Sequence, residues 1–340
     1  AAMVLSSPEL SPTSLSELPQ QLRCLGEPGW GVIALEGADD SSLVQKSHEL
    51  QSWLDDHKGT AAAIARRWLG THPGDGNAAR AVSILFENQE ALLQATQSVS
   101  RFLEGAALEM KGHCWELHRY SETPLGFSGD VTFMYPGSGS LFPAAGRRLL
   151  TRYPGCLDST VANSADLSGF LNDPQQWDQR STVPQDPRDS ILRQVTLGCI
   201  GTDLLLGCGV LPRRAAGHSL GETTMLFALR AWRDRSGMQQ QLQHDDLFTT
   251  WLAGEHRAAA CQWGLPSGSS APWQVAVINA SEQEVLTAIA RYPRLHLLVV
   301  NADRETVVGG DPHQLEQVAR SQSWTILPLD GVTAVHCCLV

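Results

Sequence analysis

The chain has 340 residues, of which 42% are hydrophobic and 18% charged, and its acidic excess gives a formal net charge of −11. This balance is typical of a globular protein and excludes an intrinsically disordered one. The acidic excess and the lack of a basic block argue against nucleic acid as a partner.

Further features of composition concern the cell compartment and metals. No apolar run reaches transmembrane length, and the N-terminus lacks the basic and apolar regions of a signal peptide. The eight cysteines have irregular spacings, form no C-x-x-C pair and have no histidine cluster beside them. We therefore expect reduced thiols, no zinc site, no membrane span and a cytoplasmic location.

The first third of the chain predicts a lead-in and a small domain. Residues 1–28 are rich in Ser, Pro and Leu and are expected to form a flexible lead-in. Residues 29–122 predict an α/β domain with the element order β-α-α-β-α-β. Its predicted strands are 30–36, 79–86 and 114–118, and its predicted helices are 41–57, 61–69 and 88–103. No catalytic constellation occurs there.

A second domain is expected over 129–340. Its first predicted elements are a strand over 131–135, a helix over 144–152, an irregular polar segment over 163–188, a strand over 204–210 and a helix over 223–232. From about 247 to 330 the order becomes β-α-β-β-α-β, which is the split βαβ or ferredoxin-like arrangement. The strands predicted in this part are 273–279, 295–300, 305–308 and 324–329, and the helices are 282–291 and 312–320.

The stretch Gly217-His218-Ser219-Leu220-Gly221 reads G-x-S-x-G, the pattern of a nucleophile elbow. Such an elbow is a sharp strand-to-helix turn that presents a serine hydroxyl above a parallel sheet. The apolar run before it and the helical run after it favour this interpretation over a coincidental glycine turn. Elbow geometry directs the side chain of His218 away from the path of serine attack, so we assign it to the lining of the pocket.

A glycine-rich loop, Pro136-Gly-Ser-Gly-Ser140, follows the first predicted strand of the second domain. Glycines allow backbone amides to approach an oxygen atom closely. A phosphate-binding loop is the alternative, but no G-K-[ST] follows, so that alternative is discounted.

The motif GHSLGE, with Glu222 directly after the second glycine, resembles the active-site motif of acyl-CoA:acyl-carrier-protein acyltransferases. The stretch VTFMYPGSGS, residues 131–140, resembles the first strand and glycine loop of that family. The branch that the chain most resembles comprises the acyltransferase domains of polyunsaturated fatty acid synthases and type I polyketide synthases. The resemblance implies an α/β-hydrolase-like parallel-sheet core, an inserted ferredoxin-like subdomain and, over 29–122, the linker domain between ketosynthase and acyltransferase.

The resemblance also implies roles for single residues. Ser219 would be the nucleophile and His336, just beyond the small subdomain, its general base. The backbone amides of Ser138 and Leu220 would form the oxyanion hole, although the family usually has Gln at the position of Ser138. A glutamine near Gln194 lies close to the active site in the family. Gln194 is equally well explained as a hydrogen-bonded core residue.

The same resemblance implies substrates and partners. The substrate would be an acyl-CoA, the acceptor an acyl carrier protein domain and the neighbour a ketosynthase domain, with no metal or organic cofactor. Malonyl-selective relatives carry an arginine where this chain has Gln243 and His244, so a preference for uncharged acyl groups is expected. The family continues beyond the position of Val340, so a fragment is expected. A serine thioesterase and a non-catalytic scaffold fragment are the alternatives.

Overall fold

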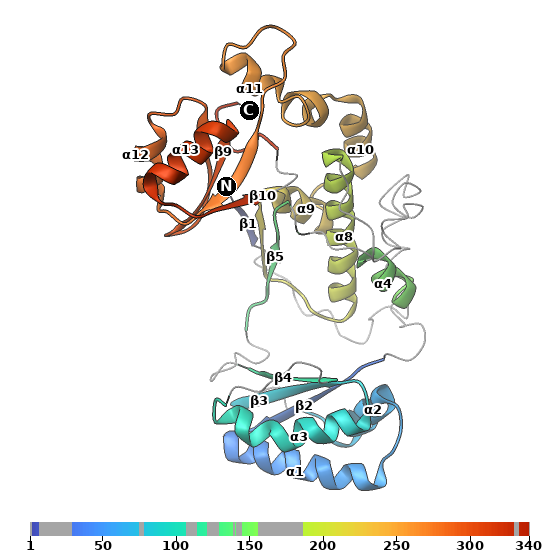
Figure 1. The fold of residues 1–340 in the computed structure, drawn as a ribbon. Coiled ribbons are helices and arrows are strands. Elements are labelled where there is room, and N and C mark those ends of the chain that lie inside the picture. The colour runs from blue at the N-terminus through green and yellow to red at the C-terminus, as the bar shows by residue number, and fades with distance from the viewer. Residues whose placement is uncertain are drawn as a thin grey trace. The chain divides into compact units, whose positions relative to one another are not determined.

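The computed structural model describes residues 2–6, 29–74, 78–106, 114–120, 129–138, 140, 145–155, 186–329 and 333–339. The chain divides into two compact units (Figure 1). One comprises residues 24–131, and the other comprises residues 1–23 together with 132–340.

The unit of residues 24–131 is a three-stranded antiparallel sheet with helices packed on it (Figure 1). Its elements in chain order are β2 (Gly31–Gly37), α1 (Asp40–Asp56), α2 (Ala61–Thr71), β3 (Arg80–Phe86), α3 (Gln89–Leu103) and β4 (Trp115–Arg119). This is the predicted order, and the strands pair as β2-β3-β4.

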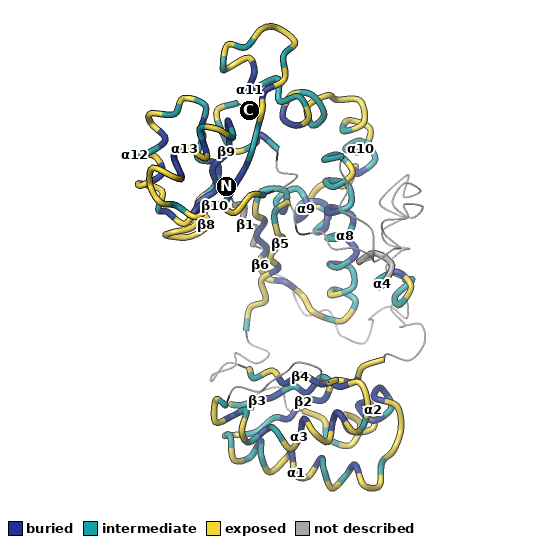
Figure 2. The backbone as a smooth tube through the Cα atoms, viewed as in Figure 1, coloured by how far each residue is buried: buried dark blue, intermediate teal, exposed yellow. Residues whose placement is uncertain are grey.

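Alternation along the strands produces the core of this unit, because successive side chains of a strand point to opposite faces. Ile33, Ile84 and Leu117 lie side by side in register and are all buried. The helices bury Leu43, Leu92 and other apolar residues in the same cluster, which Figure 2 shows as dark blue stretches facing the sheet.

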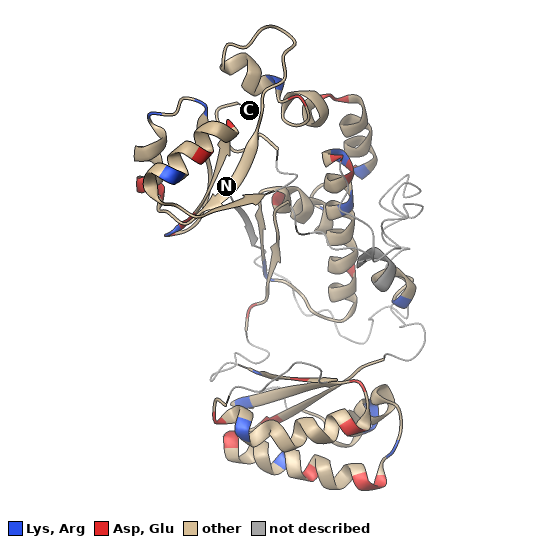
Figure 3. Ribbon diagram, viewed as in Figure 1, with Lys and Arg blue, Asp and Glu red and all other residues tan. Residues whose placement is uncertain are grey.

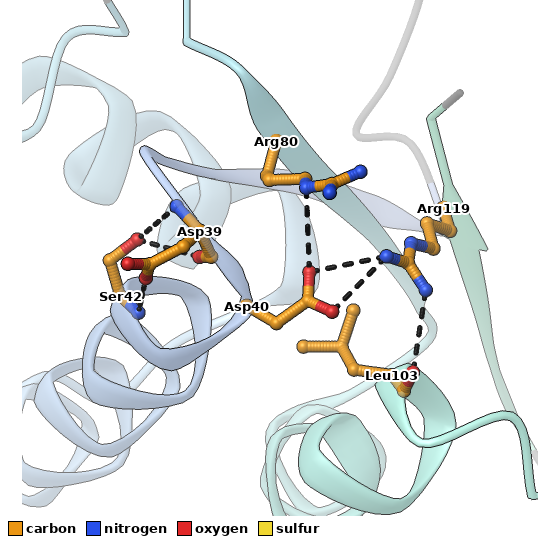
Figure 4. A network of polar contacts seen from close by, with 6 residues as sticks. All are labelled: Asp39, Asp40, Ser42, Arg80, Leu103 and Arg119. Atoms are coloured by element: carbon orange, nitrogen blue, oxygen red, sulfur yellow. Dashed lines mark hydrogen bonds and ion pairs between the residues drawn. The ribbon is translucent and has the colours of Figure 1, made fainter. Parts of the chain in front are cut away.

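Capping and ion pairs fix the ends of the helices in this unit. Asp39 accepts a hydrogen bond from the backbone of Ser42 in a capping box at the start of α1. Asp40 beside it accepts two hydrogen bonds from Arg119 of β4, which also donates to the carbonyl of Leu103 at the end of α3 (Figure 4). Because Asp40 and Arg119 are partly exposed, the pair contributes at most about 1 kcal/mol. Both acidic and basic residues occur on the helices of this unit (Figure 3).

The second unit contains the sheet that carries the predicted elbow. Strand β5 (Thr132–Tyr135) lies parallel to β6 (Arg214–His218), and β1 (Ala2–Ser6) lies antiparallel on the other side of β6. Residues 2–6 belong to the segment that was expected to be a flexible lead-in. The rest of that segment, residue 1 and residues 7–28, lies outside the described residues, as does most of 163–188.

Helices pack beside this sheet. Helix α4 (Ala145–Arg152) and the long α8 (Pro187–Gly207) precede β6, and α9 (Leu220–Ala228) follows it directly. Helix α10 (Arg235–His244), the π-helical turn η4 (Leu247–Trp251) and α11 (Arg257–Gln262) complete this part. The buried contacts of Phe133, Val195, Ala215 and Met225 join β5, α8, β6 and α9 into one core.

The predicted strand over 204–210 is wrong, because residues up to Gly207 belong to α8. Asp186 caps the start of this helix, and Pro187 occupies its first turn, where a proline needs no amide partner. The strand before the elbow is instead Arg214–His218, whose buried residues are Ala215, Ala216 and Gly217. Small side chains at these positions have low strand propensity but allow the neighbouring elements to pack closely.

The last part of this unit has the predicted order β-α-β-β-α-β. Its elements are β7 (Gln274–Ile278), α12 (Glu282–Ile289), β8 (Leu295–Ala302), β9 (Glu305–Gly310), α13 (Pro312–Gln322) and β10 (Ile326–Leu329). The strands form an antiparallel sheet in the order β10-β7-β9-β8. Helices α12 and α13 pack on one face through residues such as Val285 and Leu315. The opposite face, with Val275 and Val307, packs against Cys337.

Candidate active site

Ser219 occupies the turn between β6 and α9 in a strained backbone conformation. Its φ is 55° and its ψ is −119°, a combination that non-glycine residues rarely adopt. Such strain costs on the order of 1–3 kcal/mol and is found at sites where the surrounding structure enforces it. The backbone amide of Glu222 donates to the carbonyl of Ser219 at 2.9 Å and closes the turn.

The two glycines of the motif are required by close backbone contacts. A Cβ atom on Gly217 would overlap the backbone of Gly221 and Glu222. A Cβ atom on Gly221 would overlap the carbonyl of Tyr135 and would lie 2.8 Å from that of Pro136. The elbow helix therefore packs directly against the end of β5.

His336 meets this serine from a point 117 residues further along the chain. Its Nε2 atom lies 2.7 Å from the Oγ atom of Ser219, which is hydrogen-bond distance. An imidazole at this distance from a hydroxyl is placed as a base must be to activate a serine nucleophile. His336 is exposed overall, but partial desolvation of its imidazole lowers the pKa of His336 below its ordinary value, and the charge of His218 lowers it further, whereas the charge of Glu222 raises it. The neutral form, which is the form that can accept a proton, is thereby favoured.

The segment that carries His336 is fixed by contacts on both sides of it. The amide of Ala334 donates to the carbonyl of Leu252 at 2.7 Å, and Ala334 is fully buried. Cys337 packs on the β7–β9 face, and Leu339 packs beside Trp263. Among the residues that the structure describes, no carboxylate is hydrogen-bonded to His336. The negative charge of Glu222 raises the pKa of His336. In the sequence, Glu222 is recognised by its position directly after the second glycine of the elbow motif.

The two amides predicted to form an oxyanion hole lie at adjacent strand ends. Strands β5 and β6 are parallel, with Tyr135 opposite Gly217. The residues that follow them, including Ser138 and Leu220, therefore emerge at the same edge of the sheet. Leu220 is the first residue of α9, where backbone N–H groups have no partner within the helix.

The structure places the three residues predicted to bind substrate in different surroundings. His218 is exposed at the end of β6, close to Gly137 and His336. Gln194 is buried, and its amide nitrogen donates at 2.8 Å to each of the carbonyls of Pro136 and Gly137. His244 is exposed at the end of α10, with Nδ1 2.7 Å from the carbonyl of Gln240 in its own helix.

The arginines near the elbow in sequence are engaged elsewhere. Arg230 forms a bidentate ion pair with Asp203 at 2.7 and 2.8 Å and donates to the carbonyls of Phe227 and Ala228. Arg235 is buried, and Arg257 pairs with Glu255 at 2.7 Å.

A cavity of about 570 Å³ opens beside the segment that leads to His336. This volume lies within the range of small-molecule sites. Its lining includes Asp186, Phe248, His256, Trp273, Leu329 and Thr333. Burial lowers the pKa of His256.

The described residues contain neither a candidate metal site nor a candidate membrane-spanning helix. Within these ranges, no group of three or more His, Cys, Asp or Glu residues is arranged to hold a metal ion. None of the helices described is both long and apolar enough to cross a membrane.

Comparison with known proteins shows that this α/β fold is that of the acyltransferase domains of polyketide synthases. The acyltransferase domain from module 8 of the salinomycin polyketide synthase matches 89% of this chain with 66% of its own length, at a TM-score of 0.61 and 16% identity. The acyltransferase domain of SpnD, solved in complex with 2-(pent-4-yn-1-yl)malonyl, matches 91% of the chain with 66% of its own, at a TM-score of 0.60 and 15% identity.

Sequence comparison gives the same class of protein. The pikromycin polyketide synthase component PikAIII of Streptomyces venezuelae is 25% identical over 214 residues, which are 61% of this chain and 12% of that protein. A phenolphthiocerol/phthiocerol polyketide synthase polypeptide of Mycobacterium tuberculosis is 24% identical over 193 residues, 55% of this chain and 11% of that protein. The chain thus spans about a tenth of the length of these curated relatives. No family model matches it.

Proposed function

We propose that this chain is an acyltransferase that moves an acyl group from coenzyme A, through an acyl-serine at Ser219, to the phosphopantetheine thiol of an acyl carrier protein domain. The observation that carries the proposal is the 2.7 Å contact between Ser219 Oγ and His336 Nε2 at a strained elbow. The likeness to polyketide synthase acyltransferase domains supports it.

The proposed reaction has two half-reactions. Ser219 Oγ attacks the thioester carbonyl while His336 Nε2 takes the hydroxyl proton, and the coenzyme A thiol leaves with that proton. The carrier-protein thiol then attacks the acyl-serine, and His336 removes the thiol proton and returns a proton to Oγ. In both half-reactions the oxyanion accepts hydrogen bonds from the backbone amides of Ser138 and Leu220. Each donor of this kind typically stabilises the transition state by about 3 kcal/mol.

The wider assignment belongs to the same proposal. We infer an α/β-hydrolase-like core around β5 and β6 with a ferredoxin-like subdomain over about 247–330. The sheet order β10-β7-β9-β8 supports the second assignment. The unit of residues 24–131 would be a linker domain next to a ketosynthase. We further propose that the chain takes part in the synthesis of fatty acids, including polyunsaturated fatty acids, or of polyketides, and that it does so in the cytoplasm.

Intact-protein mass spectrometry after incubation with acetyl-CoA tests the acyl-serine. We expect one added acetyl group, mapped by peptide analysis to Ser219 and absent from Ser219→Ala. Ser138→Ala is the matched control, because the proposed role of Ser138 uses only its backbone amide and the variant should load normally. An acetyl group mapped to another residue would contradict the proposal.

A further inference from the structure

Gln194 is a buried polar residue whose hydrogen bonds go to a different element. It lies in α8 and is 6% exposed. Its Nε2 atom donates to the carbonyls of Pro136 and Gly137, each at 2.8 Å. A side-chain amide has two N–H donors, so both are committed to the loop after β5.

These two carbonyls determine the direction of the next backbone amides. The Gly137 carbonyl and the Ser138 N–H belong to one planar trans peptide unit, in which the two groups point in opposite directions. A carbonyl held toward α8 therefore directs the Ser138 N–H away from α8. The same reasoning applies to the Pro136 carbonyl and the Gly137 N–H. Ser140 adds a third hydrogen bond, from its Oγ to the Gly137 carbonyl at 2.9 Å.

The loop lies directly against the elbow as well. A Cβ atom on Gly137 would lie 2.8 Å from Nδ1 of His218 and 3.2 Å from its carbonyl oxygen. A side chain there would crowd the His218 ring, and the lack of a Cβ makes rotation of the adjoining peptide units easy. A loop of this kind needs an external partner to hold one peptide orientation.

Helix packing holds Gln194 in a fixed place relative to Ser219. Gly198 lies one turn after Gln194 on the same face of α8. A Cβ atom at Gly198 would overlap the methyl group of Thr224 in α9. The two helices therefore approach closely at this point, and α9 begins directly after Ser219.

We propose that Gln194 is a positioning residue of the oxyanion hole, which holds the Gly137–Ser138 peptide so that the Ser138 amide is presented to the oxyanion formed at Ser219. This inference rests on the proposed acyl transfer at that serine. Gln194 would act on the transition state through the loop, without contacting the substrate.

Two reagents separate this inference from the proposed function. Acetyl-CoA reports the acyl transfer itself. A fluorophosphonate probe reports the nucleophile, the base and the oxyanion hole without any acyl-CoA, because Ser219 Oγ gives up its proton to the base and displaces fluoride at phosphorus, and the phosphoryl oxygen occupies the position of the oxyanion. If the unmodified chain reacts with the probe and not with acetyl-CoA, the proposed function fails and the inference is still judged on the probe rates.

The variants are Gln194→Ala and Gln194→Glu, the second being nearly isosteric and able to donate at most one hydrogen bond where Gln194 donates two. Loss of an oxyanion donor lowers kcat by about 100- to 1000-fold, and a donor that is only mispositioned loses less. We expect both variants to lower kcat for acetylation and the probe rate about 10- to 100-fold, with the KM for acetyl-CoA changed less than about twofold.

Thr196→Val is the matched control, because Thr196 is buried in the same helix and, among the residues that the structure describes, its hydroxyl bonds only to the carbonyl of Leu192. It should react at the unmodified rate. If Gln194→Ala does not fold, Gln194→Glu and Ser140→Ala decide, and we expect Ser140→Ala to show a smaller loss. Folded Gln194 variants that react with both reagents at the unmodified rate, or a loss confined to KM, would overturn the inference.

Discussion

The contact between the elbow helix and β5 leads to a quantitative prediction for Gly221→Ala. The new methyl carbon would overlap the carbonyl oxygen of Tyr135 and would lie 2.7 Å from its carbonyl carbon and 2.8 Å from the oxygen of Pro136. Ordinary contacts of a carbon atom lie at about 3.5–4.0 Å, so β5 and α9 must separate by at least about 1 Å. All the opposing atoms belong to the backbone, which has no rotamer to change.

Two effects of that separation can be measured. Overpacking of this kind costs about 1–3 kcal/mol, and we expect the upper end because Tyr135 is buried. A shift of about 1 Å at a catalytic group also slows the reaction about 100-fold. The assays are the midpoint of urea unfolding and the rate of acetylation of Ser219 by acetyl-CoA.

Gly201→Ala is the matched control for Gly221→Ala. Gly201 lies inside α8, and apart from its own helix backbone no heavy atom of the described residues would lie within 4 Å of an added Cβ. Alanine is favoured over glycine in a helix interior by up to about 1 kcal/mol, so this variant should be slightly more stable and fully active. The reasoning is refuted if Gly221→Ala is as stable and as active as the unmodified chain.

Three further predictions concern the base and the choice of substrate. The pKa of His336 is lowered from 6.5, and the neutral ring is the form that acts as a base. Acetylation should therefore keep its full rate at pH 7 and lose it only as the pH falls through a midpoint below 6.5. A midpoint above 6.5 in the pH profile of kcat/KM would count against this assignment. His336→Ala should slow acetylation of Ser219 at least about 100-fold, and an unchanged rate would assign the base to another residue. Acetyl-CoA should be preferred to malonyl-CoA in kcat/KM, and His244→Arg, with Gln243→Arg as the control in the adjacent register, should shift the ratio toward malonyl; a strong malonyl preference of the unmodified chain would show that a different cation pairs with the carboxylate.

Much of the fold followed from periodicity in the sequence. The strands and helices of residues 29–122 and of 273–329 were predicted in the observed order, because each buries one regular face against a core. The prediction of a strand over 204–210 was wrong because Leu204, Leu205 and Leu206 form an apolar run that fits a strand as well as a buried helix. The actual strand, Arg214–His218, buries only the small residues Ala215, Ala216 and Gly217, which give neither an apolar run nor an alternating strand pattern.

The candidate site could be predicted in part. The elbow is a local motif, so Ser219 and the need for Gly217 and Gly221 followed from the sequence alone. The contact between Ser219 and His336 depends on the fold of the whole intervening subdomain, so no local pattern in the sequence predicts it. The pairing was expected only from the resemblance to the acyltransferase family. The contact of Gln194 with the Gly137 carbonyl joins residues 57 positions apart, and no local pattern encodes which way a buried amide points.

Transfer of the acyl group from the preformed acyl-enzyme tests the central claim most directly. The chain would be acetylated with isotope-labelled acetyl-CoA, freed of coenzyme A, and mixed with either an acyl carrier protein bearing phosphopantetheine or buffer alone. The account predicts that the label leaves Ser219 for the phosphopantetheine thiol at least about 100 times faster than it is released as free acetate. Equal release with and without the thiol acceptor would contradict the account and make the chain a hydrolase.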